Sequence, residues 1–273
     1  MIPRTIHSIW FQGEQVIPAK YQADRAALRA MNPGWAYKLW DDTSLQAACR
    51  EFDRVYPGSE SWAKYVGFEL MHQKIDFGRY VVLALYGGMS IDMDVVPIRP
   101  LDATPGLDHD GVQVIVSGVP LRHSFEEYMF TFGEMTGLYN NAMILAVPRA
   151  ALMVQLVRDV IATPPSDAFL VVNRIQWTTG PLTFTRSLKR SQSQSRDDKA
   201  LLVLDNKYFE PCFGGDVHCA LPPDAILYHN HAQTWVPAWI VNAGWLYYAL
   251  KPFLLPVVVL AAFVWWSRAR SRA

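Results

Sequence analysis

Apolar and polar positions follow two different periods along the first part of the chain. Residues 5–11 and 36–40 have the short apolar pattern of strands, whereas residues 18–31 and 43–53 have the period of amphipathic helices. The resulting order is strand, helix, strand, helix. This order predicts a parallel sheet whose strands are joined by crossover helices.

The rest of the chain continues in the same way. The pattern predicts a long helix over residues 64–86, helices over 150–162 and 180–190, and strands over 89–91, 112–118, 142–147, 201–204 and 226–229. Residues 191–199, rich in Ser, Gln and charged residues, are expected to form an exposed loop. With 273 residues, 51% of them hydrophobic, the chain is long enough to bury one sizeable core and carry an appendage.

Composition narrows the classes of partner and compartment. The formal net charge is zero and no basic stripe alternates with aromatic residues, so nucleic acid is not an expected partner. Cys49, Cys212 and Cys219 show no Cys-x-x-Cys spacing, and we expect small buried thiols rather than a disulfide framework. Residues 2–11 read as a strand of the domain and not as a signal peptide.

Two acidic residues follow the predicted strand 89–91 and are separated by one residue. Gly87 and Gly88 allow a tight turn between the preceding helix and this strand. Asp92 and Asp94 then fall at the carboxyl end of the strand, where ligands gather in open α/β sheets. Side chains two apart in an extended segment share a face, so both carboxylates are placed to approach one divalent cation. The alternative is a pair of solvated acids at an ordinary turn.

One face of the predicted helix 64–86 carries polar residues that lead toward the same turn. Asp76 and Arg79 are three residues apart and therefore meet on the helix surface. Helix spacing alone favours an ordinary salt bridge, worth about 0.2–0.5 kcal/mol. Because the helix runs directly into the glycine turn, the same polar face is also placed to point toward Asp92 and Asp94.

Other polar and aromatic residues stand at the ends of predicted strands. His229 and His231 are spaced to face one side, and either is able to complete a cation's ligand set or contact a diphosphate, with His231 preferred. Asn141 precedes another strand, where ligand contact and turn chemistry explain it equally well. Trp10 ends the first strand, where packing in the core is the ordinary explanation.

Several blocks of sequence, in a fixed order, resemble the Asp-x-Asp sugar transferases of glycosyltransferase family 32. This family includes the inositol phosphoceramide mannosyltransferases and the yeast outer-chain mannosyltransferases. The blocks are residues 2–10, Asn32-Pro33-Gly34-Trp35, residues 37–42, residues 74–80, the Gly-Gly-x-x-x-Asp-x-Asp run at 87–94, Thr179-Gly180-Pro181, His229-Asn230-His231 and Thr234-Trp235. Thr234 departs from the serine of the family but keeps a hydroxyl.

The resemblance implies an α/β fold of the GT-A type, a nucleotide-diphospho-sugar transferase fold with a Rossmann-like, mixed but mostly parallel sheet. It implies that Asp76, Arg79, Asp92 and Asp94 form the catalytic site and that Asp92, Asp94 and His231 hold the metal. Manganous ion is the usual occupant by resemblance, and an oxygen-rich site also admits Mg²⁺.

The resemblance also implies how the donor is held. Asp76 and Arg79 contact the sugar, and Trp10 stacks on the nucleotide base, a contact worth about 1–3 kcal/mol in other proteins. The expected donor-binding residues are Trp10, Asp76, Arg79, Asp92, Asn141 and Trp235. Retention at the anomeric carbon is implied, with front-face displacement as the expected route and a covalent glycosyl-enzyme as its rival. No carboxylate is assigned as a covalent nucleophile.

These observations predict a metal-dependent, retaining glycosyltransferase that moves a hexose, with mannose favoured. The donor would be GDP-mannose or a UDP-hexose, and the acceptor a lipid-linked molecule or a glycan, with inositol phosphoceramide suggested by the relatives. Two alternatives stay open. One is a catalytically silent, membrane-tethered protein that binds nucleotide or carbohydrate, against which the intact acidic residues speak. The other is a nucleotide-sugar phosphohydrolase, which needs a further group to activate water.

The C-terminal residues predict membrane association. Residues 245–266 are apolar except for Lys251, and a basic tail follows over residues 267–273. Lys251, Pro252 and Pro256 interrupt the first half of this segment, and only residues 253–266 are free of charge, which is short for a bilayer-spanning helix. Tryptophans beside arginines are typical of a membrane interface. We therefore expect a catalytic domain over residues 1–240 and a transmembrane or monotopic anchor, with the catalytic domain on the cytosolic face, or in a lumen if the protein is secretory and eukaryotic.

Overall fold

The computed structural model describes residues 1–119, 137–194, 199–212 and 220–231, together with Trp239, Asn242, Leu246 and Leu250. The chain divides into two compact units. The larger unit contains Met1–Phe213 and Cys219–His231, and the smaller contains Gly214–His218 and Ala232–Ala273. All of the strands and helices described below belong to the larger unit.

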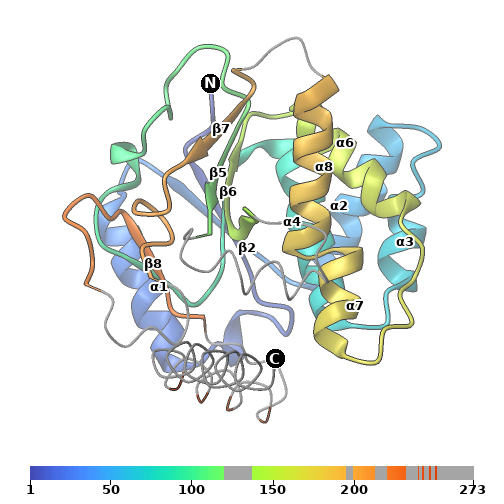
Figure 1. Cartoon of the computed structure of the whole chain (residues 1–273), viewed down its shortest axis with the longest axis horizontal. Helices are drawn as coiled ribbons and strands as arrows, with labels where there is room; N and C mark the ends of the chain where they lie inside the picture. The colour runs from blue at the N-terminus through green and yellow to red at the C-terminus, as the bar shows by residue number, and fades with distance from the viewer. Residues whose placement is uncertain are drawn as a thin grey trace, which may run out of the picture. The chain divides into compact units, whose positions relative to one another are not determined.

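A six-stranded mixed sheet lies at the centre of the larger unit, as Figure 1 shows. Its strand order is β2-β1-β3-β6-β5-β7, with β1 (Thr5–Ile9), β2 (Ala36–Trp40), β3 (Gly88–Ile91), β5 (Val114–Gly118), β6 (Tyr139–Ala146) and β7 (Leu201–Leu204). Strand β1 pairs in parallel with β2 and β3, and β5 pairs in parallel with β7. Strand β6 runs antiparallel to both β3 and β5. The predicted α/β fold with a mixed, mostly parallel sheet is confirmed.

A second, two-stranded antiparallel sheet joins segments that are far apart in the sequence. It consists of β4 (Val95–Pro97) and β8 (Leu227–His229), and it pairs Val95 with His229. The pattern of the sequence predicts β8 but not the short β4. The pairing matters for the site, because it brings His229 next to the residue that follows Asp94.

Helices cover both faces of the central sheet. Figure 1 shows one helix on one side and most of the others gathered on the opposite side. The first side has α1 (Ala19–Met31), and the second has α2 (Asp42–Val55), α3 (Ser61–Gly67), α4 (Met71–Tyr86), α6 (Ala151–Ala162), α7 (Val171–Thr178) and α8 (Pro181–Gln194). Short 3-10 helices occur at Glu14–Val16 and Leu101–Ala103. The buried hydrophobic side chains accordingly form two clusters.

The predicted long helix over residues 64–86 is wrong. The chain forms α3 and α4 instead, because the backbone is extended at Phe68 and Leu70. The side chain of Gln73 then accepts a hydrogen bond from the backbone N–H of Leu70, at 3.3 Å, and so caps the new helix. The predicted loop 191–199 is also wrong in its first part, since α8 continues to Gln194. Helix α7 was not predicted.

The tight glycine turn between α4 and β3 is confirmed. Gly87 has φ 63° and Gly88 has φ 88°, backbone conformations that side chains other than glycine rarely adopt. A Cβ atom at Gly88 would lie 2.5 Å from the backbone oxygen of Thr5. The turn therefore brings α4 directly into the middle of the sheet.

The structure also bears on two expectations about the cysteines and about apolar helices. Cys212 is disulfide-bonded, which contradicts the expectation of unpaired thiols, whereas Cys49 is free and buried as expected. The count and spacing of cysteines do not determine pairing, and this explains the error. Among the helices within the described residues, none is long and apolar enough to cross a membrane. The predicted anchor 245–266, apart from Leu246 and Leu250, the tail 267–273 and Trp235 lie outside the described residues.

Candidate functional site

Arg79 lies at the centre of a group of polar side chains contributed by three elements. Its Nη2 is 2.7 Å from Oδ1 of Asp92, just after β3, and its Nη1 donates to the backbone oxygen of Asn141 in β6 at 2.7 Å. Its Nε lies 3.7 Å from Oδ1 of Asp76, on the same helix. The side chain of Arg79 is only 4% exposed. The helix-surface salt bridge weighed as an alternative therefore does not describe this arginine, whose shortest ionic contact is with Asp92.

Asp76 is held by Asn141 on β6 and by Thr179, the residue that follows α7. The side-chain amide of Asn141 donates to Oδ1 of Asp76 at 3.0 Å and to the hydroxyl of Tyr80 at 2.9 Å. The hydroxyl of Thr179 donates to Oδ2 of Asp76 at 3.3 Å, and the hydroxyl of Tyr80 donates to the backbone oxygen of Thr179 at 2.7 Å. Predicted Asp76, Arg79, Asp92 and Asn141 are thus one connected network.

The two carboxyl groups of this network are costly to ionise, and Arg79 only partly offsets that cost. Burial raises the pKa of Asp76 to about 7, with the nearby Asp92 also raising it and Arg79 opposing the shift. Burial likewise raises the pKa of Asp92, against the effect of Arg79 and with that of Asp94. The raised pKa values indicate that Arg79 only partly stabilises the ionised forms of Asp76 and Asp92. A bound cation would stabilise these ionised carboxylates further.

Asp92, Asp94 and His229 offer such a cation a set of ligand atoms. One atom from each lies within 4.8 Å of the other two. Oδ1 of Asp94 is 3.3 Å from Nε2 of His229. The backbones are fixed as well, because the N–H of Asp92 donates to the carbonyl oxygen of Ala142 at 2.9 Å and the N–H of Asn230 donates to the carbonyl oxygen of Asp94 at 3.0 Å. Two carboxylates and an imidazole fit Mn²⁺, which accepts both oxygen and nitrogen ligands.

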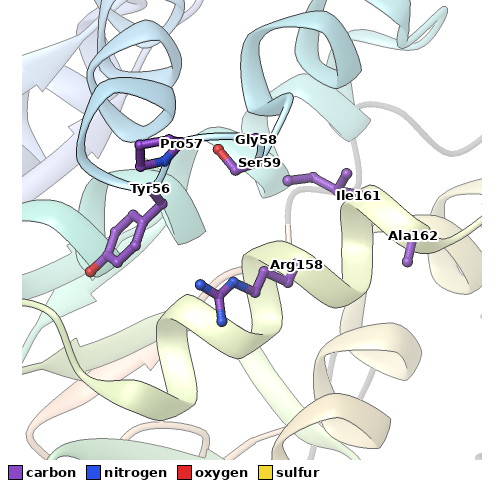
Figure 2. A pocket seen from close by; sticks show the side chains of 7 residues that line it. All are labelled: Tyr56, Pro57, Gly58, Ser59, Arg158, Ile161 and Ala162. Atoms are coloured by element: carbon purple, nitrogen blue, oxygen red, sulfur yellow. The ribbon is translucent and has the colours of Figure 1, made fainter.

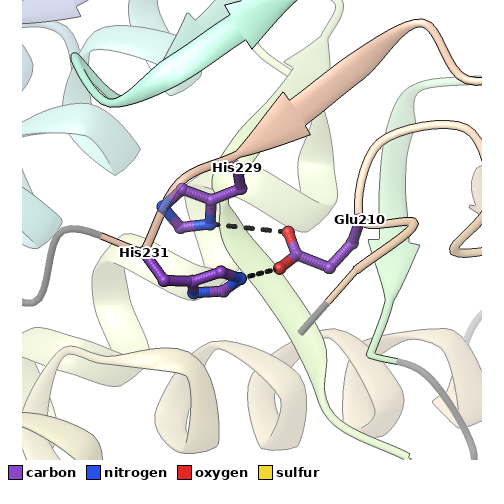
Figure 3. A group of neighbouring side chains, drawn as sticks. All are labelled: Glu210, His229 and His231. Atoms are coloured by element: carbon purple, nitrogen blue, oxygen red, sulfur yellow. Dashed lines mark hydrogen bonds and ion pairs between the residues drawn. The ribbon is translucent and has the colours of Figure 1, made fainter. Parts of the chain in front are cut away.

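His231 belongs to a neighbouring group rather than to the one that contains both aspartates. His229 and His231 both face Glu210, as the sticks in Figure 3 show. The two imidazole rings lie 4.0 Å apart between centroids. The structure therefore groups His229, and not the preferred His231, with Asp92 and Asp94. His229 shares in both groups.

The two neighbouring carboxylates favour the protonated form of His229. Burial alone would lower the pKa of His229, but the charges of Glu210 and Asp94 outweigh this effect and raise the pKa to about 10. The pKa of Glu210 is lowered: burial works against the shift, while the His229 and His231 rings outweigh it. Without a metal, His229 is thus a cation between two carboxylates.

Glu210 and Asn140 are site residues that sequence reasoning missed. The side-chain amide of Asn140 donates to Oε2 of Glu210. Glu210 is fully buried although it lies in no motif. The sequence carries no clear signal for either residue, because the burial that marks Glu210 is visible only in the structure.

Trp10 lies on the same side of the fold as the acidic turn. Its ring is 5.7 Å from that of Tyr21, and its buried Nε1 has no hydrogen-bond partner among the described residues. Burial raises the pKa of Tyr21, and the charge of Asp94 adds to the shift. The base-binding role of Trp10 stays a prediction.

A separate pocket of about 280 Å³ lies where the end of α2 meets α6 (Figure 2). It is lined by Tyr56, Pro57, Gly58, Ser59, Arg158, Ile161 and Ala162. The lining shares no residue with the acidic group and contains neither a carboxylate nor a histidine. It does not offer the chemistry of a cation site.

A family of known proteins matches the part of the chain that contains the acidic residues of the site. Residues 18–110 match the family described as "Glycosyltransferase sugar-binding region containing DXD motif", a range that contains Asp76, Arg79, Asp92 and Asp94. The chain is 25% identical over 239 residues to an uncharacterized glycosyltransferase of Acanthamoeba polyphaga mimivirus, covering 87% of this chain and 85% of that protein.

Other similarities are partial. Inositol phosphoceramide mannosyltransferase 1 of Schizosaccharomyces pombe is 30% identical over 106 residues, which is 37% of this chain and 30% of that protein. The solved structure of the PaToxG glycosyltransferase has 15% identity and a TM-score of 0.49, with 70% of each chain covered. That of the galactosyltransferase LgtC has 13% identity and a TM-score of 0.44, with 84% of this chain and 87% of that chain covered. Residues 18–110 thus match the sugar-binding region of glycosyltransferases that contain a DXD motif, and the chain is similar to proteins named as glycosyltransferases.

Proposed function

We propose that this glycosyltransferase is metal-dependent and retaining, and that it moves a hexose from a nucleotide sugar to a lipid-linked or glycan acceptor. The observation that carries the proposal is the group of Asp92, Asp94 and His229, whose ligand atoms lie within 4.8 Å of one another. The mixed sheet with an Asp-x-Asp turn at the end of β3 supports a GT-A-type fold. Transfer from a nucleotide sugar releases a diphosphate, whose charge the site has to stabilise.

The cation would be held by Asp92, Asp94 and His229, with Mn²⁺ favoured and Mg²⁺ the alternative. When bound, it supplies Lewis-acid stabilisation of negative charge on the departing diphosphate. Arg79 orients the carboxylate of Asp92 from the interior of the domain, through a short contact of its guanidinium group. Its planar fork also suits oxygens of the donor.

Asp76 and Arg79 are proposed to hold the donor sugar. A carboxyl group with a pKa of about 7 both accepts and donates hydrogen bonds near neutral pH, which suits recognition of sugar hydroxyls. Asn141 and Thr179 orient this group through their hydrogen bonds. Trp10, whose indole N–H has no hydrogen-bond partner among the described residues, is proposed to stack on the base, and Trp235 to contact the donor. Front-face displacement is the proposed route to retention.

Mannose and a sphingolipid acceptor are proposed on the names of partial relatives. Inositol phosphoceramide mannosyltransferases 1 and 3 of Schizosaccharomyces pombe match 37% of this chain but only 30% and 26% of their own lengths. GDP-mannose and inositol phosphoceramide are therefore the first pair to test. The apolar residues 245–266 support association with a membrane, and we propose that the catalytic domain works on its cytosolic face.

A donor screen tests the proposal. The full chain is incubated with GDP-mannose, UDP-glucose, UDP-galactose and UDP-N-acetylglucosamine, each with Mn²⁺, with Mg²⁺ or with a chelator, and with inositol phosphoceramide in detergent as acceptor. We expect transfer of one hexose that needs the metal, with the α linkage of the donor retained. Flotation with anionic vesicles tests the membrane proposal. Sugar transfer that is equal in the chelator would contradict metal dependence, and a protein that stays unbound in the flotation would contradict association.

A further inference from the structure

Glu210 is a fully buried carboxylate whose position is fixed by its own backbone. Its N–H donates to the oxygen of Asn206 at 2.7 Å, and its carbonyl accepts from the side-chain amide of Asn206 at 3.2 Å. The preceding segment is tied to β8, since the oxygen of Tyr208 accepts from the N–H groups of Ile226 and Leu227. The carboxylate is therefore presented from a rigid part of the chain, next to the strand that carries His229.

Both oxygens of Glu210 are used by the neighbouring residues. Oε2 accepts from the amide of Asn140 and lies 3.4 Å from Nδ1 of His229, while Oε1 contacts Nε2 of His231. Figure 3 shows both imidazoles turned toward the carboxylate. A buried acid without such partners would be costly, so this arrangement explains how Glu210 is tolerated.

His229 lies between two carboxylates, one at ion-pair distance from each ring nitrogen. Nδ1 faces Glu210, and Nε2 lies 3.3 Å from Oδ1 of Asp94. The pairing of β4 with β8 sets the position of the residue, but it does not set the rotation of its ring. In metal sites, the partner of the second nitrogen decides which nitrogen faces the metal and how firmly the ring is oriented.

We propose that Glu210 is a positioning residue that holds the His229 imidazole with Nε2 toward Asp94, and that it thereby makes the Asp92–Asp94–His229 site prefer Mn²⁺ to Mg²⁺. The inference rests on the proposed function, which assigns a divalent cation to these residues. Mg²⁺ takes oxygen ligands almost entirely, whereas Mn²⁺ also accepts imidazole. A ring that is free to turn would remove the nitrogen ligand and leave both aspartates, which serve the two ions alike.

The test compares the affinities of the full chain for Mn²⁺ alone and Mg²⁺ alone by calorimetry, with Mn²⁺ also followed by electron paramagnetic resonance. Glu210→Gln keeps the size of the side chain and an oxygen that accepts from Asn140. We expect its affinity for Mn²⁺ to fall about 10- to 100-fold, and its affinity for Mg²⁺ to change by less than about 3-fold. Glu69→Gln is the matched control, because Glu69 is exposed and only 3.9 Å from Arg174, and it should match the wild type.

A double-mutant cycle separates positioning from general damage. If Glu210 acts through His229, then Glu210→Gln combined with His229→Gln should bind Mn²⁺ no more weakly than His229→Gln alone. Additive losses, or equal losses for both ions, would overturn the inference. So would two bound Mn²⁺ ions in the wild type falling to one in Glu210→Gln, because Glu210 would then be a ligand itself.

The remaining outcomes are equally decisive. Should Glu210→Gln fail to fold, Asn140→Ser removes the amide that holds Oε2 while keeping the charge of Glu210. A selective loss of Mn²⁺ affinity of about 3-fold or more in that variant supports the inference, and an unchanged preference overturns it. If the wild type and Glu210→Gln bind Mn²⁺ equally well, the inference about Glu210 is overturned but the proposed metal dependence is not. A wild type that binds neither ion overturns the proposed metal dependence as well.

Discussion

Nη2 of Arg79 lies 2.7 Å from Oδ1 of Asp92, and both atoms belong to side chains that the fold withdraws from bulk water to different degrees: Arg79 is 4% exposed and Asp92 is 31% exposed. This contact ties α4 to the end of β3. It also means that the acidic turn is not an independent surface feature, because its first carboxylate is fixed from the interior of the domain.

Replacing Arg79 is expected to damage both stability and activity. Arg79→Ala leaves Asp76 and Asp92 without their buried counter-charge, so the free energy of unfolding should fall by about 3 kcal/mol or more. Arg79→Lys keeps the charge without the planar fork, and it should keep more of the stability while losing most of the turnover. Urea denaturation and a donor-turnover assay measure the two effects.

Arg54→Ala is the matched control for Arg79→Ala. Arg54 also stands three residues after an acid, 4.0 Å from Glu51, but its side chain is 78% exposed. It should change the free energy of unfolding by less than about 0.5 kcal/mol. If Arg79→Ala were as stable as Arg54→Ala, the buried network would have no role in holding the fold.

The glycine turn before the acidic residues is expected to tolerate no side chain. In Gly88→Ala, a methyl group would lie 2.5 Å from the backbone oxygen of Thr5 at a φ of 88°. The clash with backbone and the strained φ should lower the free energy of unfolding by about 3 kcal/mol or more. Gly34→Ala, where nothing lies within 4 Å of the added atom, should fold normally. Equal melting temperatures for the two variants would show that the turn relaxes freely.

The sequence predicted those elements whose conformation depends on neighbouring residues in the chain. Strand β2 and the glycine turn were placed by periodicity and by the conformational freedom of glycine. The break between α3 and α4 was missed, because it depends on an extended backbone at Phe68 and Leu70 and on the cap that Gln73 provides, not on Gly or Pro within residues 68–70. Strand β4 was missed because three residues carry no period.

The site divides in the same way. Asp92 and Asp94 are separated by one residue and share a motif, so they were found together. His229 joins them only through the pairing of β4 with β8, and Glu210 only through a loop that no motif marks. Asp76 and Arg79 are buried because α4 packs against the rest of the domain on more than one side. The three-residue spacing of these two residues does not reveal this packing.

The pH dependence of stability is expected to report His7. Nδ1 of this buried histidine accepts from Nε1 of Trp40 at 3.1 Å, and Nε2 then donates to the oxygen of Gly87 at 2.9 Å. Burial lowers the pKa of His7 from 6.5 to about 4, with Lys38 adding to the shift and the bond to Gly87 opposing it. A proton on Nδ1 would also face the indole N–H of Trp40.

The direction of the effect follows from the two pKa values. Between pH 6.5 and 4, His7 is protonated in the unfolded chain but stays neutral in the folded chain. The contribution of neutral His7 to the free energy of unfolding is therefore complete above pH 6.5 and is lost as the pH falls toward 4. The loss should reach about 3 kcal/mol. In His7→Gln this slope should be absent, and the stability advantage of the wild type should shrink as the pH falls. Parallel curves of unfolding free energy against pH would contradict the assignment.

The central claim is that Asp92, Asp94 and His229 bind the cation on which sugar transfer depends. The most direct measurement is a Mn²⁺ titration of donor turnover in the wild type, in Asp94→Asn and in Asp108→Asn, an exposed acid that pairs with Arg4. The claim predicts that Asp108→Asn follows the wild-type curve, while Asp94→Asn folds normally and loses about 100-fold or more of the turnover at every Mn²⁺ concentration. Near-normal turnover by Asp94→Asn in added Mn²⁺ would contradict it.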